Sequence, residues 1–359
     1  MKRKYAAGVL SLVMAASLML AGCGGKNNAA VKEEEGGAVK TDKGVINVYT
    51  ARHYDIDFAM FDEFEKKTGI VVNEIKGTAE ELVERMKREG ESSEADLFIT
   101  VDGGVLNYAK ENGVLQPIES EAIFQNVPEN LRDKDSNWVA IASRARVIAY
   151  SKDRVKPEQL STYEALTEEQ WKGKVLVRSS SNMYNQSLLA AMIELQGEEK
   201  AEQWAKGLVN NFSRDPDGGD RDQAKAIVAG VGDVAIMNTY YVGQMLHSKD
   251  AEEVKVAQNI GIFFPNQETT GAHLNVSGVG LAAHAKNKEN ALKLVEFMTS
   301  KEGQEMLING SFEFPVNKEA ALPELLKEWG EFKTENIDYA KLGVHNKKAT
   351  EIMNKVGWK

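Results

Sequence analysis

The sequence predicts an α/β fold arranged as two lobes. From residue 45 onward, short apolar strands alternate with helices, a pattern typical of βαβ units. The length of 359 residues corresponds to about two domains of roughly 150 residues each. No linker rich in Pro, Gly or Ser separates two domains, which favours lobes joined by continuous strands. We therefore expect mostly parallel strands with crossover helices.

The segment after residue 44 holds the clearest element signals. Aromatic residues at helical spacing precede Gly69, which is placed to end that helix. Thr78 and Glu81 form a capping box that predicts the start of a second helix, and Gly90 is placed to close it. The alternation of apolar residues predicts three strands here, at residues 45–49, 70–75 and 96–101.

The alternation continues through the rest of the chain. Apolar runs predict further strands at residues 145–150, 175–177, 234–237 and 274–282. Amphipathic spacing predicts helices at residues 188–195, 200–212, 223–229 and 289–298. These elements extend the α/β pattern to both expected lobes.

The N-terminus is typical of a secreted lipoprotein. Three basic residues at positions 2–4 precede an apolar stretch at 6–21, which is too short for a usual membrane span. Cys23, the single cysteine of the chain, follows Leu-Ala-Gly, as in a lipobox where the thiol is acylated. We expect residues 1–22 to be a cleaved signal peptide and the polar segment 23–44 to be a flexible tether.

The charge balance is acidic. The formal net charge is -10, and removal of residues 1–22 takes away three positive charges and leaves -13. An acidic surface disfavours nucleic acid as a partner and favours cationic ligands.

The sequence motifs that would indicate an enzyme are incomplete or absent. Residues 278–283 match G-x-G-x-x-A, but they lie far from an N-terminal βαβ unit and suggest a strand running straight through. The acidic run 215–220 lacks the ligand pattern of a calcium loop, so we expect Asp220 to cap a helix instead. The five histidines show no H-E-x-x-H spacing, and no phosphate-binding or nucleophile-elbow motif is present.

Three segments combine tyrosine or histidine with a position directly after a predicted strand. They are residues 52–54, 179–185 and 238–241. In open α/β sheets, ligands bind at the carboxyl ends of strands, where these loops lie. A single tyrosine at a strand end is usually a packing residue. Together the segments would bring one histidine and four tyrosines to a common cleft: His53, Tyr54, Tyr184, Tyr240 and Tyr241.

From residue 45 to the C-terminus the chain resembles bacterial ferric-ion-binding proteins, the receptors of iron ABC importers. The runs that carry the resemblance cover nearly the whole of this region: VYTARHYD, ADLFITVDGG, RARVIAYSK, VRSSSNMYNQSLLA, GGDRDQ, GDVAIMNTYY, GAHLNVSGVGLAAHAKN and FEFPVN. The subgroup that it resembles uses tyrosines and a histidine as ligands and needs no synergistic anion.

The resemblance implies a specific fold and a specific set of metal ligands. The fold would be a two-lobed clamp of the periplasmic-binding-protein type II, with RARVIAY and LNVSGVGLAA as hinge strands. Lobe 1 would comprise residues 45–143 and 272–317, and lobe 2 residues 144–271 and 318–359. Arg144 matches an arginine beside the metal, and the ligands would be His53, Tyr54, Tyr184, Tyr240 and Tyr241.

The resemblance also implies a role. The chain would be a monomeric receptor on the extracytoplasmic face of the cell membrane, anchored through Cys23. It would bind ferric iron, Fe(3+), as the transported ligand and deliver it to the permease and ATPase of an ABC importer. Another receptor of the same fold, for a polyamine, thiamine or an oxyanion, stays open. A secreted metalloenzyme, which would need an open coordination position and a general base, is a further alternative.

The chemistry of tyrosine suits ferric iron. Phenolate is an anionic oxygen donor that already serves iron in haem proteins. Because a free tyrosine has a pKa of about 10, binding should release protons. Four phenolates and Fe(3+) would sum to -1, and Arg144 beside them would bring the sum to zero. We therefore expect binding that needs no outside anion.

Overall fold

The computed structural model describes residues 44–52 and 54–359. The described residues belong to one compact unit. The expected signal peptide at 1–22, the lipidation site Cys23, the tether up to residue 43 and the expected ligand His53 lie outside the described residues. Among the described helices, none is both long and apolar enough to cross a membrane.

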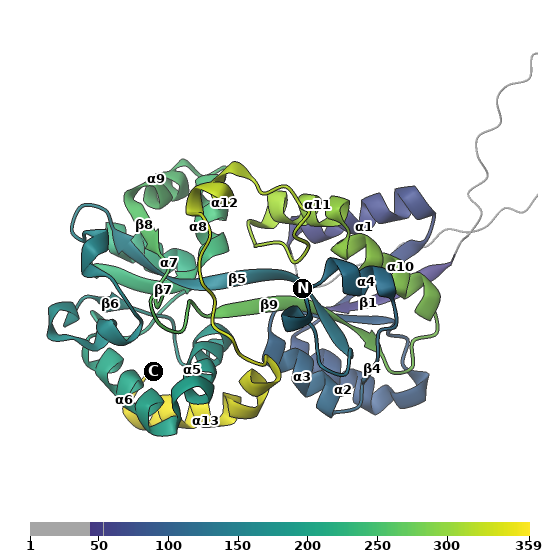
Figure 1. The fold of residues 1–359 in the computed structure, drawn as a ribbon, viewed down its shortest axis with the longest axis horizontal. Coiled ribbons are helices and arrows are strands. Elements are labelled where there is room, and N and C mark those ends of the chain that lie inside the picture. The colour runs from purple at the N-terminus through teal and green to yellow at the C-terminus, as the bar shows by residue number, and fades with distance from the viewer. Residues whose placement is uncertain (1–43, 53) are drawn as a thin grey trace, which may run out of the picture. The chain divides into compact units, whose positions relative to one another are not determined.

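The strands of the described region form a single sheet (Figure 1). Its order is β2-β1-β3-β9-β5-β7-β6, with β4 paired to β9 and β8 paired to β5. The strand bounds are β1 Val45–Thr50, β2 Val71–Lys76, β3 Leu97–Thr100, β4 Leu115–Gln116, β5 Trp138–Ser151, β6 Val175–Leu176, β7 Val234–Asn238, β8 Ile260–Phe263 and β9 Leu274–Ala282.

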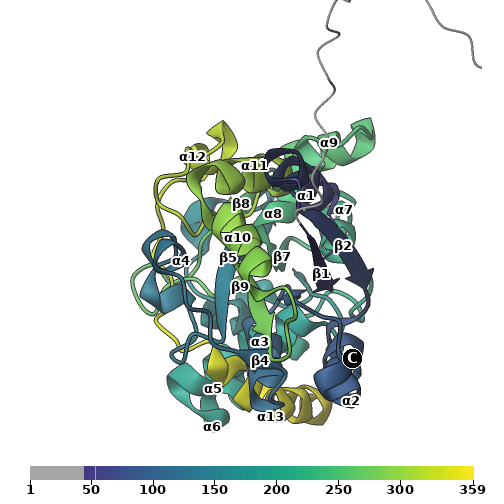
Figure 2. The same ribbon diagram turned by 90° about the vertical axis from the view of Figure 1, so that its right-hand side faces the viewer.

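The helices form two groups, one around each end of the sheet, with the long strands β9 and β5 between them (Figures 1 and 2). The first helices and two later ones pack around β1–β4: α1 Asp55–Thr68, α2 Ala79–Glu89, α3 Gly103–Glu111, α4 Glu121–Asn126, α10 Lys288–Thr299 and α11 Lys301–Ser311. The others lie mainly around β6–β8: α5 Met183–Gln196, α6 Glu198–Asn210, α7 Asp220–Val228, α8 Thr239–Leu246, α9 Ala251–Asn259, α12 Glu324–Trp329 and α13 Ala340–Val356.

Two long strands join the two groups of elements, which we call the first and the second lobe. β9 pairs antiparallel with β3 in the first lobe and with β5 along its length. The far end of β5 then pairs antiparallel with β7 and β8 in the second lobe. The expected continuous crossings are therefore present. The expectation of mostly parallel strands is wrong, because the crossing strands return through the sheet in opposite directions.

A third chain crossing returns to the second lobe after α11 (Figure 1). Ala272, just before β9, forms a β-bridge with Thr334 on this returning segment. Next to the bridge, the buried ring of His273 hydrogen-bonds through Nδ1 to the carboxylate of Glu335. The returning segment is thus attached to the start of a hinge strand. The division of the lobes at residues 143, 271 and 317 stays a prediction.

Most of the helix ends and caps predicted from the sequence are present in the structure. α1 ends at Gly69, whose φ of 75° lies in the left-handed region that glycine favours. Thr78 and Glu81 form the predicted capping box of α2. Asp220 does not cap α7, because Gly219 holds the cap position and the carboxylate of Asp222 accepts a hydrogen bond from the Gly219 N–H. Asp220 is buried instead.

Candidate metal-binding site

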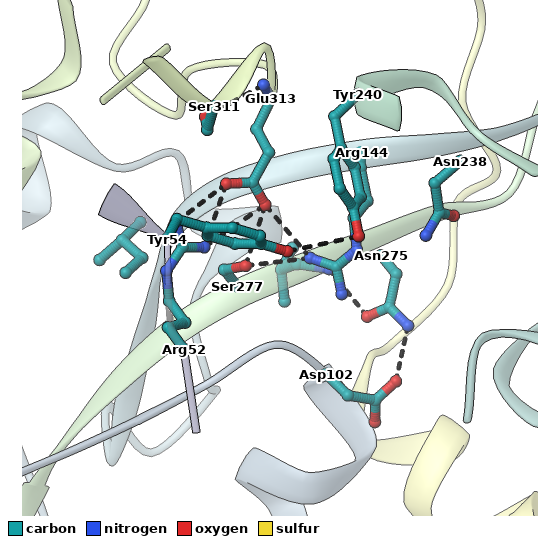
Figure 3. Close-up of polar contacts among 12 residues, drawn as sticks. Arg52, Tyr54, Asp102, Arg144, Asn238, Tyr240, Asn275, Ser277, Ser311 and Glu313 are labelled. Carbon is teal, nitrogen blue, oxygen red and sulfur yellow. Dashed lines mark hydrogen bonds and ion pairs between the residues drawn. The ribbon is translucent and has the colours of Figure 1, made fainter. Parts of the chain in front are cut away.

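Three tyrosine hydroxyls from three separate segments meet between the lobes. The Tyr54 hydroxyl donates to the Tyr240 hydroxyl at 3.3 Å (Figure 3). The Tyr184 and Tyr240 hydroxyl oxygens are 3.4 Å apart. Tyr54 comes from the first lobe, and the other two come from the second. The structure thus brings three of the residues that the sequence singled out into one cluster, which we call the tyrosine cluster.

Local structure explains why these side chains meet. Tyr54 lies just after β1 at the N-cap of α1, Tyr184 is in the first turn of α5, and Tyr240 is in the first turn of α8. Each segment follows a strand of the sheet, so each tyrosine lies at the carboxyl end of β1, β6 or β7. This is the edge at which α/β sheets bind ligands.

Tyr241 supports the cluster through its ring. Its ring centroid lies 4.2 Å from that of Tyr240, with 31° between the ring planes. Ring packing at this distance fixes the orientation of both side chains.

No group of three or more His, Cys, Asp or Glu side chains in the described part of the chain is arranged to hold a metal ion. We take the tyrosine cluster as the candidate site because its hydroxyls come from both lobes.

Buried ion pairs surround the tyrosine cluster on the first-lobe side. The Arg52 guanidinium pairs with Asp57 at 2.9 Å and with Glu313 at 3.1 Å, and it lies 4.7 Å from the centre of the Tyr54 ring. Phe312, with a φ of 61°, ends α11 in the left-handed region, just before Glu313. This turn leads the chain from the helix end into the cleft.

Arg144 lies beside the cluster, as the resemblance implied, but it does not stand alone. Its carbon Cζ is 5.2 Å from the centre of the Tyr184 ring. Its Nη1 donates to Ser277 at 3.0 Å and lies 3.5 Å from Glu313 (Figure 3). Two other nitrogens, Nε and Nη2, are buried without a hydrogen-bond partner among the described residues. They are free to interact with anionic oxygens in the cleft.

A second set of ion pairs lies on the second-lobe side. Arg146 and Arg178 lie 3.4 Å and 3.9 Å from the carboxylate of Asp220, and both lie within about 6 Å of the Tyr184 ring. Asn185, directly after Tyr184, accepts a 2.7 Å hydrogen bond from Arg146. The paired groups around the tyrosines are therefore four guanidiniums and three carboxylates, which leave one positive charge.

This count changes the charge balance expected from the sequence. Arg144 alone cannot neutralise the site, because it shares its charge with Glu313. Sequence reasoning missed the other paired groups around the tyrosines, which are Arg52, Asp57, Glu313, Arg146, Arg178 and Asp220. Arg52 adjoins a segment that it singled out, and Glu313 lies in the FEFPVN run. No local sequence signal identifies them, because a buried arginine needs a carboxylate partner but the sequence does not show which one.

Burial raises the pKa of three tyrosines at the cleft and so favours their protonated form. Desolvation raises the pKa of Tyr54 well above its ordinary value, and the neighbouring Tyr184 and Glu313 raise it further. Burial likewise raises the pKa of Tyr240 and of Tyr241, in both cases helped by Tyr184. Arg144 opposes the rise at Tyr240. A nearby cation would oppose this rise, because positive charge favours the phenolate form.

Comparisons with known proteins agree with this architecture. A family model described as bacterial extracellular solute-binding protein matches residues 92–342. A Synechocystis protein named Iron uptake protein A1 is 45% identical over 352 residues, which are 98% of this chain and 96% of that protein. The Fe(3+)-binding periplasmic protein of Serratia marcescens is 28% identical over 322 residues, 89% of this chain and 92% of that protein.

Solved structures match equally well. A Trichodesmium protein in complex with iron and citrate ligands has a TM-score of 0.84 and 46% identity, and covers 88% of this chain and all of its own. A ferric binding protein from Campylobacter jejuni, with a TM-score of 0.83 and 41% identity, shows the same coverage. These neighbours confirm the predicted fold class, a two-lobed clamp of the type II periplasmic-binding-protein kind with two hinge strands. The chain belongs to the family of bacterial extracellular solute-binding proteins.

Proposed function

We propose that this protein is an extracytoplasmic receptor that binds ferric iron and delivers it to an ABC importer. The observation that carries the proposal is the meeting of three tyrosine hydroxyls from both lobes at 3.3 and 3.4 Å. Phenolate is a hard anionic donor, and a ligand held by both lobes would favour the closed clamp. The names of the relatives, which refer to iron uptake and ferric iron, support the same cargo.

The proposed ligands are Tyr54, Tyr184, Tyr240 and Tyr241, with His53 as a fifth. Ferric iron and four phenolates carry one negative charge. The single positive charge left by the surrounding ion pairs would neutralise it, so no bound anion is needed. A neutral cluster is far less costly to bury in a closed cleft than a charged one.

The alternative cargoes fit the cleft less well. A polyamine would need carboxylates facing it, but Asp57 and Glu313 are already paired with Arg52. An oxyanion would need several guanidiniums without a carboxylate partner. Arg144 keeps two nitrogens without a hydrogen-bond partner, but all four arginines around the tyrosines are paired with carboxylates. The proposal assigns binding rather than catalysis to the cleft.

The proposal also includes a lipid anchor that holds the protein at the membrane. Cys23 would carry the lipid anchor, residues 1–22 would be removed, and the folded part would work as a monomer beside the permease and ATPase of the importer. The lipobox pattern of residues 20–23 supports the anchor.

One spectroscopic titration tests the cargo. Ferric iron bound by phenolates should give a visible charge-transfer band in the purified protein. A Tyr240→Phe, Tyr241→Phe double variant keeps the ring packing and should lose most of the band and of the affinity. The matched control is Tyr49→Phe, which removes a buried tyrosine hydroxyl that donates to Glu89 within the first lobe, and this variant should bind like wild type. Unchanged binding by the double variant contradicts the proposed site.

A further inference from the structure

A buried carboxylate, Asp102, joins both lobes and a hinge strand at one point. Asp102 caps α3 in the first lobe, where its Oδ1 accepts a hydrogen bond from the Val105 N–H at 3.0 Å. Its Oδ2 accepts one bond from the Ser187 hydroxyl at 2.5 Å and one from the Asn275 side chain at 2.6 Å. Figure 3 shows Asp102 and Asn275 below the tyrosine cluster. Ser187 lies on α5 in the second lobe, so one carboxylate oxygen bridges the cleft.

The partners of Asp102 are also neighbours of the tyrosine cluster. Ser187 lies three residues after Tyr184 on α5, and residues at this spacing share one helix face. Asn275 on β9 lies directly opposite Arg144 on β5 in the strand register. The contact therefore connects the helix that supplies a candidate ligand with the hinge strand beside the cluster.

The energetics make this contact sensitive to lobe separation. Asp102, Ser187 and Asn275 are at most 4% exposed. Among the described residues, no Lys, Arg or His forms an ion pair with Asp102, so hydrogen bonds alone compensate for the burial of its charge. Hydrogen bonds to a charged acceptor are about twice as strong as neutral ones. When the lobes part, the Ser187 bond must break and water must take its place.

The backbone next to this contact is shaped for close approach of the lobes. A Cβ added at Gly104 on α3 would lie 2.9 Å from the Gly343 nitrogen on α13. A Cβ added at Gly343 would lie 2.8 Å from the Gly104 carbonyl oxygen. The two glycines thus let a first-lobe helix and a second-lobe helix touch beside Asp102.

We propose that Asp102 and Ser187 form a latch that holds the clamp closed over its cargo, with Asn275 orienting the carboxylate. Neither residue is a metal ligand; the pair acts on the cargo by slowing reopening of the lobes. The proposal rests on the proposed function only in taking ferric iron as the cargo. It predicts a defect in iron release rather than in iron coordination.

Ser187→Ala removes the hydroxyl that crosses the cleft and leaves all tyrosines in place. Transfer of bound iron to an excess of a strong chelator, followed by loss of the visible band, should be roughly ten-fold to a hundred-fold faster, the effect of losing one hydrogen bond to a charged group. The position of the band and the rate of iron uptake should stay unchanged. Ser187→Thr, which keeps a hydroxyl, should restore part of the slow release.

Ser93→Ala is the matched control. Ser93 is buried and donates to the Glu89 carboxylate at 3.1 Å, but both residues lie within the first lobe. Its loss should leave the release rate at the wild-type value. If Ser187→Ala lowers the melting temperature much more than this control does, Asp102→Asn gives the same test, since it keeps the shape and one acceptor oxygen while weakening the bond. It should also speed release.

Small-angle X-ray scattering separates the latch from the choice of cargo. The empty Ser187→Ala protein should have a larger radius of gyration than the empty wild type, and Ser93→Ala should not. A wild type without iron colour would defeat the proposed function but leave this comparison intact. If wild type binds iron while Ser187→Ala releases it at the wild-type rate and scatters identically, the latch is wrong.

Discussion

The hydroxyl of Tyr240 is where the candidate ligands meet, and it has no exposed surface in this structure. Burial raises its pKa, together with the nearby Tyr184 and Tyr54. The raised pKa favours the neutral phenol, so a cation that took this oxygen as a ligand would have to displace its proton. This coupling makes cargo binding depend on pH.

Iron binding should tighten as pH rises and weaken as pH falls. Because the pKa values of Tyr54, Tyr240 and Tyr241 are raised, each of these phenols must give up a proton to become a ligand at neutral pH. Tyr241→Phe should release about one proton fewer per iron than wild type. Proton release in weakly buffered solution, with the same ferric donor for both proteins, measures this difference. Equal release would remove Tyr241 from the ligand set.

The arginines and carboxylates of the cleft should set its anion requirement. Arg144→Ala deletes one positive charge beside Glu313 and should lower ferric affinity roughly ten-fold or more, whereas Arg144→Lys should restore part of it. Glu313→Gln changes the net charge of the cleft in the opposite direction, because it removes a negative charge and leaves an extra positive one. Added carbonate should therefore increase the ferric affinity of this variant. Titrations in carbonate-free and carbonate-containing buffer test both. A strict carbonate requirement in wild type would refute the charge balance.

At the scale of elements, the helix starts of the second lobe and the loop after β1 present the tyrosines, and α3 and α13 control how closely the lobes approach. Gly104→Ala should push these two helices apart, because its Cβ would lie 2.9 Å from the Gly343 nitrogen. We expect a loss of about 1–3 kcal/mol in the free energy of unfolding, as for other overpacked sites. Denaturant unfolding measures it. Gly113→Ala is the control for added bulk, since its Cβ would meet no atom within 4 Å, although its φ of 69° adds some strain.

Local periodicity predicted the elements with local causes. The predicted strand at 274–282 coincides with β9, and the capping box of α2 is present where it was expected. The predicted strand at 145–150 covers only part of β5, whose residues 138–149 are all buried. A strand buried on both faces shows no alternation, so its beginning leaves no periodic signal.

The candidate site was predictable in its tyrosines but not in its ion pairs. Tyr54, Tyr184 and Tyr240 each follow a strand, so their meeting follows from α/β topology. Arg52 and Glu313 are 261 positions apart, and nothing local in the sequence links them. Their pairing depends on the chain crossing between the lobes and on the left-handed turn at Phe312. The role of His53 as a ligand stays a prediction.

At the scale of the whole molecule, the proposed anchor should decide where the receptor is held. Cys23→Ser removes the thiol that would be acylated and should release the mature protein from the membrane fraction. Iron binding should be unaffected, because the described part folds as its own compact unit. Acyl labelling and detergent partitioning measure the change, with wild type as the reference. A variant that is still fully acylated would contradict the lipobox interpretation.

The position of β9 in the sheet also affects how the chain can fold during export. β9 lies between β3 and β5, yet it ends at Ala282, so most of the chain is made before the middle of the sheet exists. Neither β3 nor β5 can acquire its main partner until that strand emerges. The central pairings of the sheet therefore form late during synthesis, after most of the chain has been made. Synthesis that stops at residue 270 should therefore leave a protease-sensitive chain, and synthesis through the C-terminus a resistant one.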